Sequence, residues 1–310
     1  MEFRQLRYFV AIVDHGSLSR AAGVLHVAQP ALTQQLRQLE DELGAQLLHR
    51  SAQGVACTDA GKVFYEHAQA ILKQLADARS AVVQSTTRPS GAVTLGLPHS
   101  ISGALALPLL IAARAQYPEI TLQLTEEISG NLTEQLKSGR INLAVLFDDG
   151  QLGQFDAAAL VEEQMMFVCR AGSGFAPAPG AVTLAQAVAG PLILPAQQQG
   201  VRPRIESVAR AQGLQLSTII EINSIAILKS ALLADMGATI LPVAPVQQEV
   251  QTGALEAHPL REPAISRTVM LCASRNIPLT NAAAAIRRLT VSVAHALCES
   301  GSWPGAKPSV

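Results

Sequence analysis

The sequence contains few cysteines, and their positions argue against a disulfide framework. Cys57, Cys169, Cys272 and Cys298 lie far apart, and none belongs to a CxxC pair or to a Cys/His cluster with metal-ligand spacing. Cysteine is among the residue types that are most often buried. We therefore expect structural thiols in a reducing compartment, with no metal ion and no cofactor. A zinc site and a redox switch stay as alternatives that the pattern does not support.

Long apolar runs are also missing. No apolar run reaches the ~18 residues that a membrane-spanning helix needs. The N-terminal MEFRQLRYFV is charged and has neither the apolar stretch nor the cleavage site of a signal peptide. These absences predict a cytoplasmic protein without a membrane partner. Its 310 residues, 49% hydrophobic and 15% charged, are enough for two or three folded domains.

The chain has no excess of charge of one sign. Its formal net charge is −1, and residues 1–90 contain nine Lys/Arg against eight Asp/Glu, a net charge of +1. Binding to nucleic acid is often visible as a strongly basic balance. Bulk charge therefore does not indicate this function, and an argument for DNA binding must rest on the pattern of residues.

The N-terminal region does contain a series of short helical patterns. Apolar residues recur at helical spacing until Gly16, and Ser17 is a good N-cap for a second helix over 18–26. Pro30 then opens a third helix, which stops at Gly44, because proline in the first turn loses no hydrogen bond. Two short helices joined by a tight turn are the helix-turn-helix arrangement.

The start of the third helix has residues that suit the reading of DNA. Short polar side chains must approach base edges there, and Gln29, Thr33 and Gln34 are the candidates. Glutamine can pair with adenine, and the threonine methyl group can touch that of thymine. Arg37, one turn further, is placed to meet phosphate. In the alternative, Gln29 only caps its helix, and Arg37 forms a surface ion pair with the acidic run 40–42, which we expect to be a solvated face.

The segment that follows predicts two short extended pieces and a long helix. Gln53-Gly54 is typical of a turn within 46–58, and Asp59 is placed to cap a helix over 60–87. One apolar stripe runs along this helix, which usually means that it needs a partner helix. Dimerisation is the simplest explanation, and packing onto another domain of the same chain is the alternative. The stripe consists of Val63, Phe64, Ala68, Ile71, Leu72, Leu75, Ala78 and Val82.

Residues 88–91, Arg-Pro-Ser-Gly, are typical of a hinge, and the pattern changes beyond them. Short apolar runs alternate there with helical patterns, which predicts an α/β fold with largely parallel sheets. Residues 301–310 are expected to be a disordered tail. The expected strands are 92–98, 120–127, 142–147, 165–169, 192–195, 238–242 and 268–273, and the expected helices are 102–117, 131–139, 200–213, 224–237 and 281–300.

The run SLSRAAGVLHVAQPALTQQLRQLEDELGAQLLHR, followed by TDAG, resembles the signature of LysR-type transcriptional regulators. The long helix, the hinge and the α/β region also match that family's layout. The resemblance implies an N-terminal all-α winged helix-turn-helix with a long linker helix, plus an α/β effector domain of two subdomains that is similar to a periplasmic binding protein. It implies DNA contacts by Ser19, Arg20, Gln29, Pro30, Ala31, Thr33, Gln34, Arg37 and Arg50.

The wing departs from the family pattern in two places. Arg50 matches the arginine that the family inserts into or beside the minor groove. Leu48 and Gln53, however, stand where the family usually has a phenylalanine and a second basic residue. We expect the missing cation at Gln53 to weaken phosphate affinity slightly and to lower its salt dependence. Cys57 replaces a common leucine, and we expect this to be a change in core packing.

The resemblance also implies domain boundaries along most of the chain. The DNA-binding domain is expected to precede the linker helix, and the chain is expected to cross twice between the two effector subdomains. The expected segments are 1–58 for the DNA-binding domain, 59–87 for the linker and dimerisation helix, 88–91 for the hinge, 92–300 for the effector domain (subdomain one 92–162 and 267–300, subdomain two 163–266) and 301–310 for the tail.

Several strand-to-helix turns of the effector domain suit a ligand site between the subdomains. Residues 98–103 follow the first strand and open a helix whose free N–H groups and hydroxyls favour an anion. We expect a small-molecule effector, a carboxylate or another small metabolite. The alternative is that the polar residues only cap helices and that the aromatic one only packs. The candidate ligand residues are Ser100, Ile101, Ser102, Ser129, Phe147, Gln197 and Asn223.

No catalytic arrangement stands out in the sequence. His99 and Ser100 adjoin on a turn, which does not make a nucleophile–base pair, and no third group is indicated. We expect a regulator, not an enzyme, that binds double-stranded promoter DNA as a dimer or tetramer, with RNA polymerase as a further candidate partner. The alternative is a cytoplasmic ligand-binding or sequestering protein with the same α/β cleft, which leaves 1–86 unexplained. Within the family, LTEEISGNLTEQLKSGRINLAVLF and ILPAQQQGVRPRIE resemble the nitrogen-assimilation-control branch.

Overall fold

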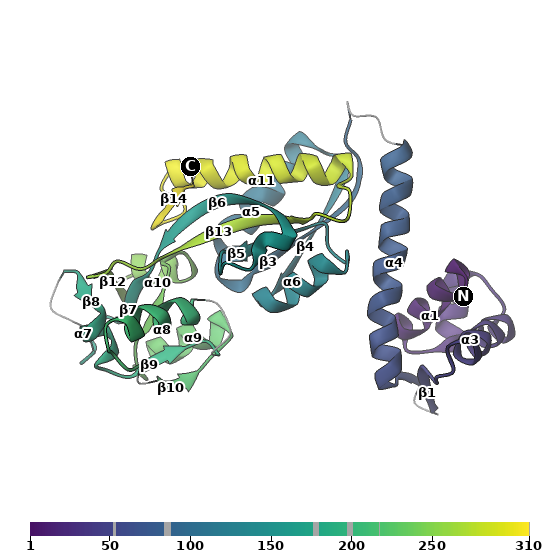
Figure 1. The fold of residues 1–310 in the computed structure, drawn as a ribbon, viewed down its shortest axis with the longest axis horizontal. Coiled ribbons are helices and arrows are strands. Elements are labelled where there is room, and N and C mark those ends of the chain that lie inside the picture. Colours follow the sequence, from purple (N-terminus) through teal and green to yellow (C-terminus); the bar gives the residue numbers. More distant parts are fainter. Residues whose placement is uncertain (52–53, 84–87, 176–179, 197–200, 217, 310) are drawn as a thin grey trace. The chain divides into compact units, whose positions relative to one another are not determined.

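The computed structural model describes residues 1–309 except 52–53, 84–87, 176–179, 197–200 and 217. The chain divides into two compact units: Met1–Val83 belongs to the first, and Gln84–Lys137 with Ile141–Val310 forms the second. Figure 1 shows the first unit as helices with one small hairpin and the second as sheets flanked by helices. Within the described part of the chain, no helix is long and apolar enough to cross a membrane.

The N-terminal unit contains the helices and the hairpin that the sequence predicts. Gly16 and Gly44 follow the first and third helices with φ of 59° and 64°, the left-handed region that glycine adopts without strain. Ser17 caps the second helix, because its side chain accepts a hydrogen bond from the backbone N–H of Arg20. The elements are α1 (Phe3–His15), α2 (Leu18–Leu25), α3 (Gln29–Leu43), β1 (Leu48–Ser51), β2 (Gly54–Cys57) and α4 (Asp59–Val83).

Two local expectations for this unit are wrong. Thr58 caps α4 in place of Asp59, because the Thr58 Oγ1 accepts a hydrogen bond from the backbone N–H of Gly61 at 2.9 Å. Glu40 is not part of a solvated face, because its Oε1 accepts hydrogen bonds from the backbone N–H groups of residues 47 and 48 at 2.8 and 3.2 Å. Glu40 therefore connects α3 to the β1–β2 hairpin.

The α/β unit is built around a mixed sheet, contrary to the largely parallel sheets expected from the sequence. Its order is β14 (Ala306–Pro308), β6 (Phe155–Gln164), β13 (Ser266–Ser274), β5 (Leu143–Phe147), β3 (Gly91–Pro98) and β4 (Ile120–Glu127). β3 pairs in parallel with β4 and β5, whereas β13 pairs antiparallel with β5 and β6. The antiparallel pairs arise because β6 and β13 carry the chain to and from a second subdomain. The helices of this first subdomain are α5 (His99–Gln116), α6 (Ser129–Lys137) and α11 (Asn281–Glu299).

The second subdomain lies between β6 and β13 in the sequence. In spatial order, β11 (Thr239–Leu241), β7 (Met166–Arg170), β12 (Leu255–Arg261) and β8 (Val182–Thr183) form a sheet, and β9 (Leu192–Leu194) pairs in parallel with β10 (Thr218–Glu221). Its helices are α7 (Leu184–Val188), α8 (Arg202–Ala211), α9 (Ile225–Leu233) and α10 (Gln247–Gln251). Single turns of 3₁₀ helix occur at Leu152–Gln154 and Ala244–Val246.

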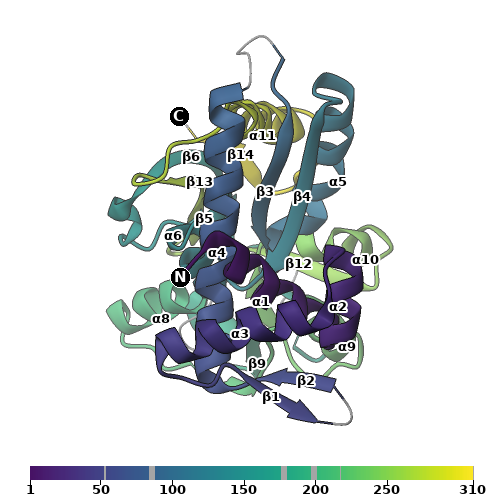
Figure 2. The ribbon, with the colours of Figure 1, turned by 90° about the vertical axis from the view of Figure 1, so that its right-hand side faces the viewer.

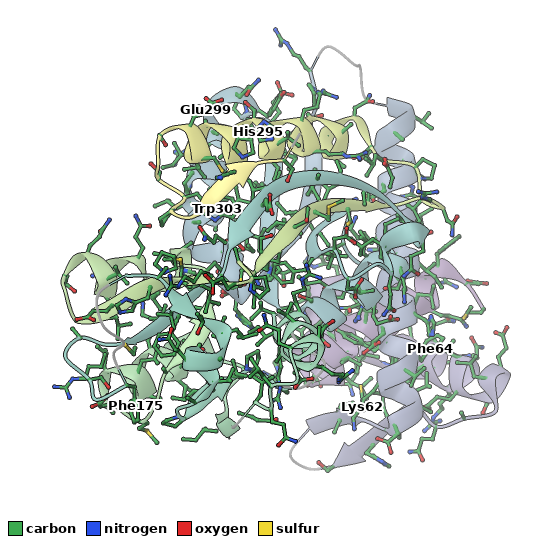
Figure 3. The ribbon with its side chains drawn as sticks, turned by 60° about the vertical axis from the view of Figure 1, so that its left-hand side comes forward. Lys62, Phe64, Phe175, His295, Glu299 and Trp303 are labelled. Atoms are coloured by element: carbon green, nitrogen blue, oxygen red, sulfur yellow. The ribbon has the colours of Figure 1, made fainter. Side chains whose placement is uncertain are left out.

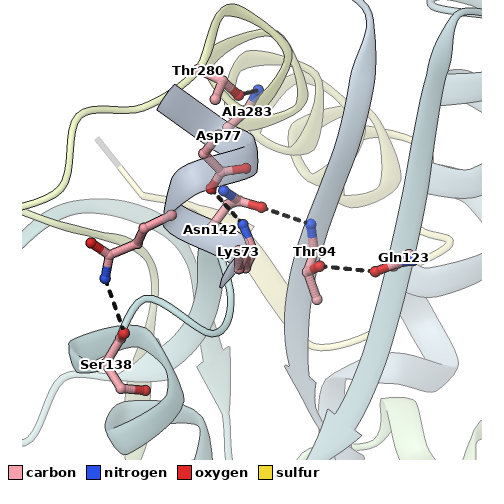
Figure 4. A network of polar contacts seen from close by, with 9 residues as sticks. Lys73, Asp77, Thr94, Gln123, Ser138, Asn142, Thr280 and Ala283 are labelled. Carbon is pink, nitrogen blue, oxygen red and sulfur yellow. Dashed lines mark hydrogen bonds and ion pairs between the residues drawn. The ribbon is translucent and has the colours of Figure 1, made fainter. Parts of the chain in front are cut away.

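Asn142 helps to fix the parallel strands of the first subdomain. Its Oδ1 accepts a hydrogen bond from the backbone N–H of Thr94 at 2.9 Å, and Thr94 Oγ1 donates to Gln123 Oε1 at 3.1 Å (Figure 4). These contacts join β3 to β4 and to the residue that precedes β5. Because these three strands are parallel, their carboxyl ends meet at one edge, where open α/β sheets usually bind ligands.

The C-terminal segment is ordered, contrary to the disorder expected for 301–310. Trp303 is 1% exposed and belongs to the main core of the first subdomain, and β14 pairs with β6. A segment rich in Gly, Ser and Pro is held here by one large aromatic side chain and a strand pairing. The sequence also did not predict β6, β8, β10, β12, α7 and α10; β6 reads FDAAALVEEQ, with few of the β-branched residues that mark strands.

Candidate DNA-binding surface and effector cavity

α2 and α3 form a helix-turn-helix that is held together by small and apolar side chains. Ala21 and Ala22 on α2 are 0% and 4% exposed, and Leu32 and Leu36 on α3 are 0% and 2% exposed. The alanines let the two helices approach closely, and the leucines fill the space between them. This core sets the angle between the helices and leaves the first turn of α3 at the surface (Figure 2).

The predicted base-reading residues stand on the first two turns of α3. Gln29 and Gln34 are exposed and Thr33 is half-buried. Ser19 Oγ donates a hydrogen bond to Gln29 Oε1 at 3.0 Å, which joins α2 to α3. Gln29 does not cap α3, because Ala28 is the N-cap residue and no side chain makes a cap hydrogen bond. The Gln29 Nε2 group donates to none of the described residues and stays available to an acceptor outside the chain.

Cations surround these polar residues. Arg20, Arg37 and Arg50 are all exposed, and so are Pro30 and Ala31 at the start of α3. The ion pairs found between described residues of this unit join Met1, Arg4, Lys62 and Lys73 to carboxylates, and none joins Arg37 to the acidic run. Unpaired arginines beside an exposed helix start are placed as phosphate contacts require.

The β1–β2 hairpin is fastened to the turn between α1 and α2. The backbone N–H of Val55 donates to the carbonyl oxygen of Gly16 at 3.0 Å, and a Cβ on Gly54 would lie 2.7 Å from that oxygen. A glycine is therefore needed at this close approach. Arg50 pairs with Val55 across the hairpin and exposes its side chain. Gln53 lies outside the described residues, so its effect on phosphate affinity stays a prediction.

The cysteines are placed as core residues. All four are free, Cys57 packs half-buried against the core of the N-terminal unit, and burial raises the pKa of its thiol. Burial also raises the pKa of Cys169 to about 11 and that of Cys272 to about 12. These thiols stay protonated and unreactive near neutral pH. Among the described residues, no cluster of His, Cys, Asp and Glu could hold a metal ion.

A cavity of about 100 Å³ lies between the two subdomains, at the carboxyl ends of β3, β4 and β5. Four of the predicted ligand residues line it: Ser100, Ser129, Phe147 and Asn223. Ile101 is instead fully buried in the core of the first subdomain, and Ser102 is not part of the wall, because neighbouring positions of α5 face different directions. Gln197 lies outside the described residues.

Arg267, on β13, makes most of the polar contacts at this cavity, and the sequence did not predict it. Its Nε and Nη2 lie 2.8 and 2.6 Å from Glu163 Oε2, and Nη2 also donates to Ser100 Oγ at 2.9 Å. Its guanidinium carbon lies 3.9 Å from the ring centroid of Phe147, a cation–π contact. One signal in the sequence could have indicated it: Arg267 lies at the start of an apolar strand. An arginine that is buried there needs a partner of opposite charge.

Glu163 is completely buried and has a partner on each oxygen. Oε2 pairs with Arg267, and Oε1 accepts a hydrogen bond from Trp303 Nε1 at 2.9 Å. Trp303 is the single tryptophan of the sequence and lies between α11 and the sheet (Figure 3). Buried ion pairs persist only when further hydrogen bonds satisfy their remaining atoms, and Trp303 and Ser100 supply them. The C-terminal segment is thus connected to the cavity through Glu163.

Two other predicted ligand residues have partners within the chain. Asn223 Oδ1 accepts a hydrogen bond from the backbone N–H of Ala196 at 2.9 Å. Ser102 Oγ donates to Glu126 Oε1 at 2.5 Å, and His99 Nδ1 lies 3.2 Å from the same oxygen. Ser102 therefore serves the start of α5, in line with the alternative that it only stabilises the helix end.

A second cavity of about 650 Å³ adjoins the first, and Phe147 and Arg267 are in the walls of both. Arg204 lines the larger cavity and is exposed. Arg202 is 6% exposed and forms ion pairs with two glutamates at 2.7 and 2.5 Å, so its charge is compensated within the chain. The Phe147–Arg267 cation–π pair therefore forms part of the wall of both the small cavity and the larger one.

Family models match both units of the chain. The model described as bacterial regulatory helix-turn-helix protein, lysR family, matches residues 3–62, and the one described as LysR substrate binding domain matches residues 86–294. The nitrogen assimilation regulatory protein nac of Escherichia coli (strain K12) is 37% identical over 297 residues, covering 94% of this chain and 95% of that protein. The protein of the same name from Klebsiella aerogenes is 38% identical over 244 residues, 78% of each chain.

Solved structures show the same fold. Full-length CbnR complexed with its target DNA has a TM-score of 0.70 and 20% identity, covering 95% of this chain and 100% of that one. The two family models together cover most of the chain, and relatives of nearly the same length share more than a third of its residues. The chain belongs to the LysR family of bacterial helix-turn-helix transcription regulators.

Proposed function

We propose that this protein recognises specific promoter sequences with α3 and the β1–β2 hairpin, and that a small molecule in the cavity between the subdomains controls this activity. Membership of the LysR family supports a DNA-binding regulator with an effector-binding domain. The observation that carries the DNA part is the exposed start of α3, where Gln29, Thr33 and Gln34 stand above a buried apolar core.

The proposed role of each of these residues follows from its chemistry. In the major groove, the Gln34 amide pairs with adenine and the Thr33 methyl group contacts thymine. Arg20 and Arg37 neutralise phosphates on the flanking backbone, and Arg50 reaches the minor groove from the hairpin. Ser19 positions Gln29 through their hydrogen bond.

α4 is the proposed dimerisation helix. Val63, Ile71 and Val82 are 61%, 37% and 86% exposed, and at helical spacing they fall on one stripe. Large apolar side chains in a row along a helix favour a second helix as partner. Two tethered reading helices gain affinity by effective concentration and select a pseudo-palindromic site. A tetramer would join two such dimers.

The effector is proposed to act by bridging the subdomains. The cavity wall includes residues of both, so a bound molecule favours one arrangement of the two over others. The response reaches transcription through the DNA complex, with RNA polymerase as the proposed further partner in the bacterial cytoplasm. No catalytic role is part of this proposal. A ligand-sequestering protein would leave the N-terminal unit without a purpose.

Footprinting on DNA tests the proposal. The DNA upstream of the protein's own gene and nitrogen-assimilation promoters are the first probes, the latter because of the relatives' name. We expect a protected pseudo-palindromic site at low salt whose occupancy falls steeply as salt rises. Arg114→Ala, which removes an exposed arginine of α5, is the control that keeps the footprint. The absence of any protected site at low salt would contradict the proposal.

A further inference from the structure

We propose that the cavity between the subdomains accepts a small uncharged molecule with a hydrogen-bond acceptor, such as an amide or another carbonyl compound, and that Glu163 determines this preference. The inference rests on the effector role proposed for this cavity. It departs from a carboxylate, one of the ligand classes expected from the sequence, because two features that would attract an anion have carboxylates beside them: Glu163 neutralises Arg267, and Glu126 stands near the start of α5.

The first feature is the guanidinium of Arg267. Glu163 Oε2 lies 2.6 Å from its Nη2 and 2.8 Å from its Nε, and Glu163 is 0% exposed. The pair carries no net charge. A carboxylate ligand would place a second negative charge beside Glu163 with only one positive charge between them, and burying an uncompensated charge is costly.

The second feature is the N-terminus of α5, which favours negative charge through its free N–H groups. Glu126 stands at this end: its Oε1 accepts a hydrogen bond from Ser102 Oγ at 2.5 Å and lies 3.2 Å from His99 Nδ1. The next residue, Glu127, is part of the cavity wall itself. β4 therefore places one carboxylate in the cavity wall and a second beside His99, which also lines the cavity, and both carboxylates disfavour an anionic ligand.

Two of the hydrogen-bond donors that remain for a ligand belong to Arg267 and Ser100. No described residue accepts a hydrogen bond from Arg267 Nη1, and Ser100 Oγ accepts from Arg267, so its own O–H is free to donate. Donors without net charge suit a neutral oxygen acceptor. The rest of the wall is largely apolar and includes Ile128, Val201, Ile222, Ile225, Leu228 and Ile240.

The size of the cavity limits the ligand. A cavity of about 100 Å³ is smaller than an engineered one of about 150 Å³ that holds benzene. The fitting molecule is a compact branched or short-chain carbonyl compound. Trp303 reports on the state of this pair, because its Nε1–H donates to Glu163 Oε1 at 2.9 Å.

The test uses full-length protein and three probes with one carbon skeleton: isobutyramide, isobutyrate and isobutylammonium. Binding is measured by calorimetry and by the indole N–H resonance of Trp303, which is unambiguous because the chain has one tryptophan. We expect the wild type to bind the amide at least about tenfold more tightly than either ion. The resonance should shift on saturation with the amide.

Three variants test whether charge determines the preference for the amide. Glu163→Gln removes the buried negative charge, and we expect the preference to reverse in favour of isobutyrate by about tenfold. Trp303→Phe keeps both charges and should keep the preference for the amide. Glu126→Gln changes an exposed residue, so folding is not at risk, and it should move the ratio towards isobutyrate by a smaller factor.

The proposal is overturned if the wild type binds isobutyrate or isobutylammonium as tightly as the amide, or binds no probe at about 10 mM. If Glu163→Gln folds and its ratio of amide affinity to isobutyrate affinity equals that of the wild type, the role of Glu163 is overturned. If that variant does not fold, an unchanged ratio in Glu126→Gln overturns the charge argument. The footprint without any probe is measured on the same preparation. A normal footprint with the wrong ligand preference refutes only this inference, whereas a missing footprint refutes the proposed function.

Discussion

On α3 and the β1–β2 hairpin, the side chains of Gln34, Arg37 and Arg50 are exposed, whereas Arg267 and Glu163 at the cavity are buried and paired. Among the described residues, none makes an ion pair or a side-chain hydrogen bond with the side chains of these three residues. At the cavity, Arg267 and Glu163 neutralise each other, with Trp303 and Ser100 completing the contacts.

The contrast follows from the cost of charge in the two environments. Unpaired cations on a surface are solvated by water and remain ready for the phosphates that give DNA binding its affinity. An unpaired buried charge costs several kcal/mol, so the chain supplies a partner for Glu163. On the proposed function, the surface formed by Gln29, Thr33, Gln34, Arg37 and Arg50 (the reading surface) therefore recognises a polyanion, and the cavity selects by shape and hydrogen bonds.

The largest effect is expected when one partner of the buried pair is removed. Arg267→Met leaves Glu163 buried and unpaired, and should lower the free energy of unfolding of the α/β unit by about 3–5 kcal/mol. Arg37→Met, an equivalent change on α3, should alter it by less than about 0.5 kcal/mol. Urea unfolding measures both. Equal effects of the two variants would remove the distinction between the two sites.

A smaller effect is expected for the hydrogen bond from the C-terminal segment. Trp303→Phe keeps most of the buried ring area but removes the donor to a buried carboxylate, a bond worth about 1.5–3 kcal/mol. The same urea experiment should show a loss of this size in the α/β unit. A loss below about 0.5 kcal/mol would mean that water or another donor replaces the indole at Glu163.

The same comparison separates what the sequence could predict from what it could not. The helix ends at Gly16, Ser17 and Gly44 follow from neighbouring residues, and so does the apolar core of the helix-turn-helix. Glu163, by contrast, meets Arg267 and Trp303 from 104 and 140 residues away. The local spacing of apolar residues contains no information on contacts between such distant residues. β6, which carries Glu163, has an alanine-rich pattern that does not indicate a strand.

On the reading surface, changes should affect DNA binding without affecting folding. Arg37→Ala removes one phosphate contact and should weaken binding to all sequences alike, lowering the salt slope by about 1. Arg114→Ala on α5 is the matched control and should leave the slope unchanged. Fluorescence anisotropy at several salt concentrations measures it. A change of sequence preference in Arg37→Ala would place this arginine at a base edge.

The smallest effect concerns Tyr65 on α4, at the edge of the N-terminal core. Burial and a hydrogen bond to Asp14 raise the pKa of Tyr65 to about 12. Because the folded pKa lies above that of the unfolded chain, this contribution to stability is complete below about pH 10 and is lost as pH rises towards about 12. Ultraviolet titration should show one late tyrosine, which Tyr65→Phe removes. A Tyr65→Phe titration identical to that of the wild type would contradict the assignment.

The most direct test of the account is the sequence preference of Gln34→Ala. Binding of the wild type and the variant is measured on a set of duplexes in which each base pair of the footprinted site is changed in turn. We predict that the variant loses discrimination at one position of each half-site, by about 1–3 kcal/mol, and keeps its affinity for nonspecific DNA. The same preference at every position in both proteins would show that α3 does not read bases through Gln34.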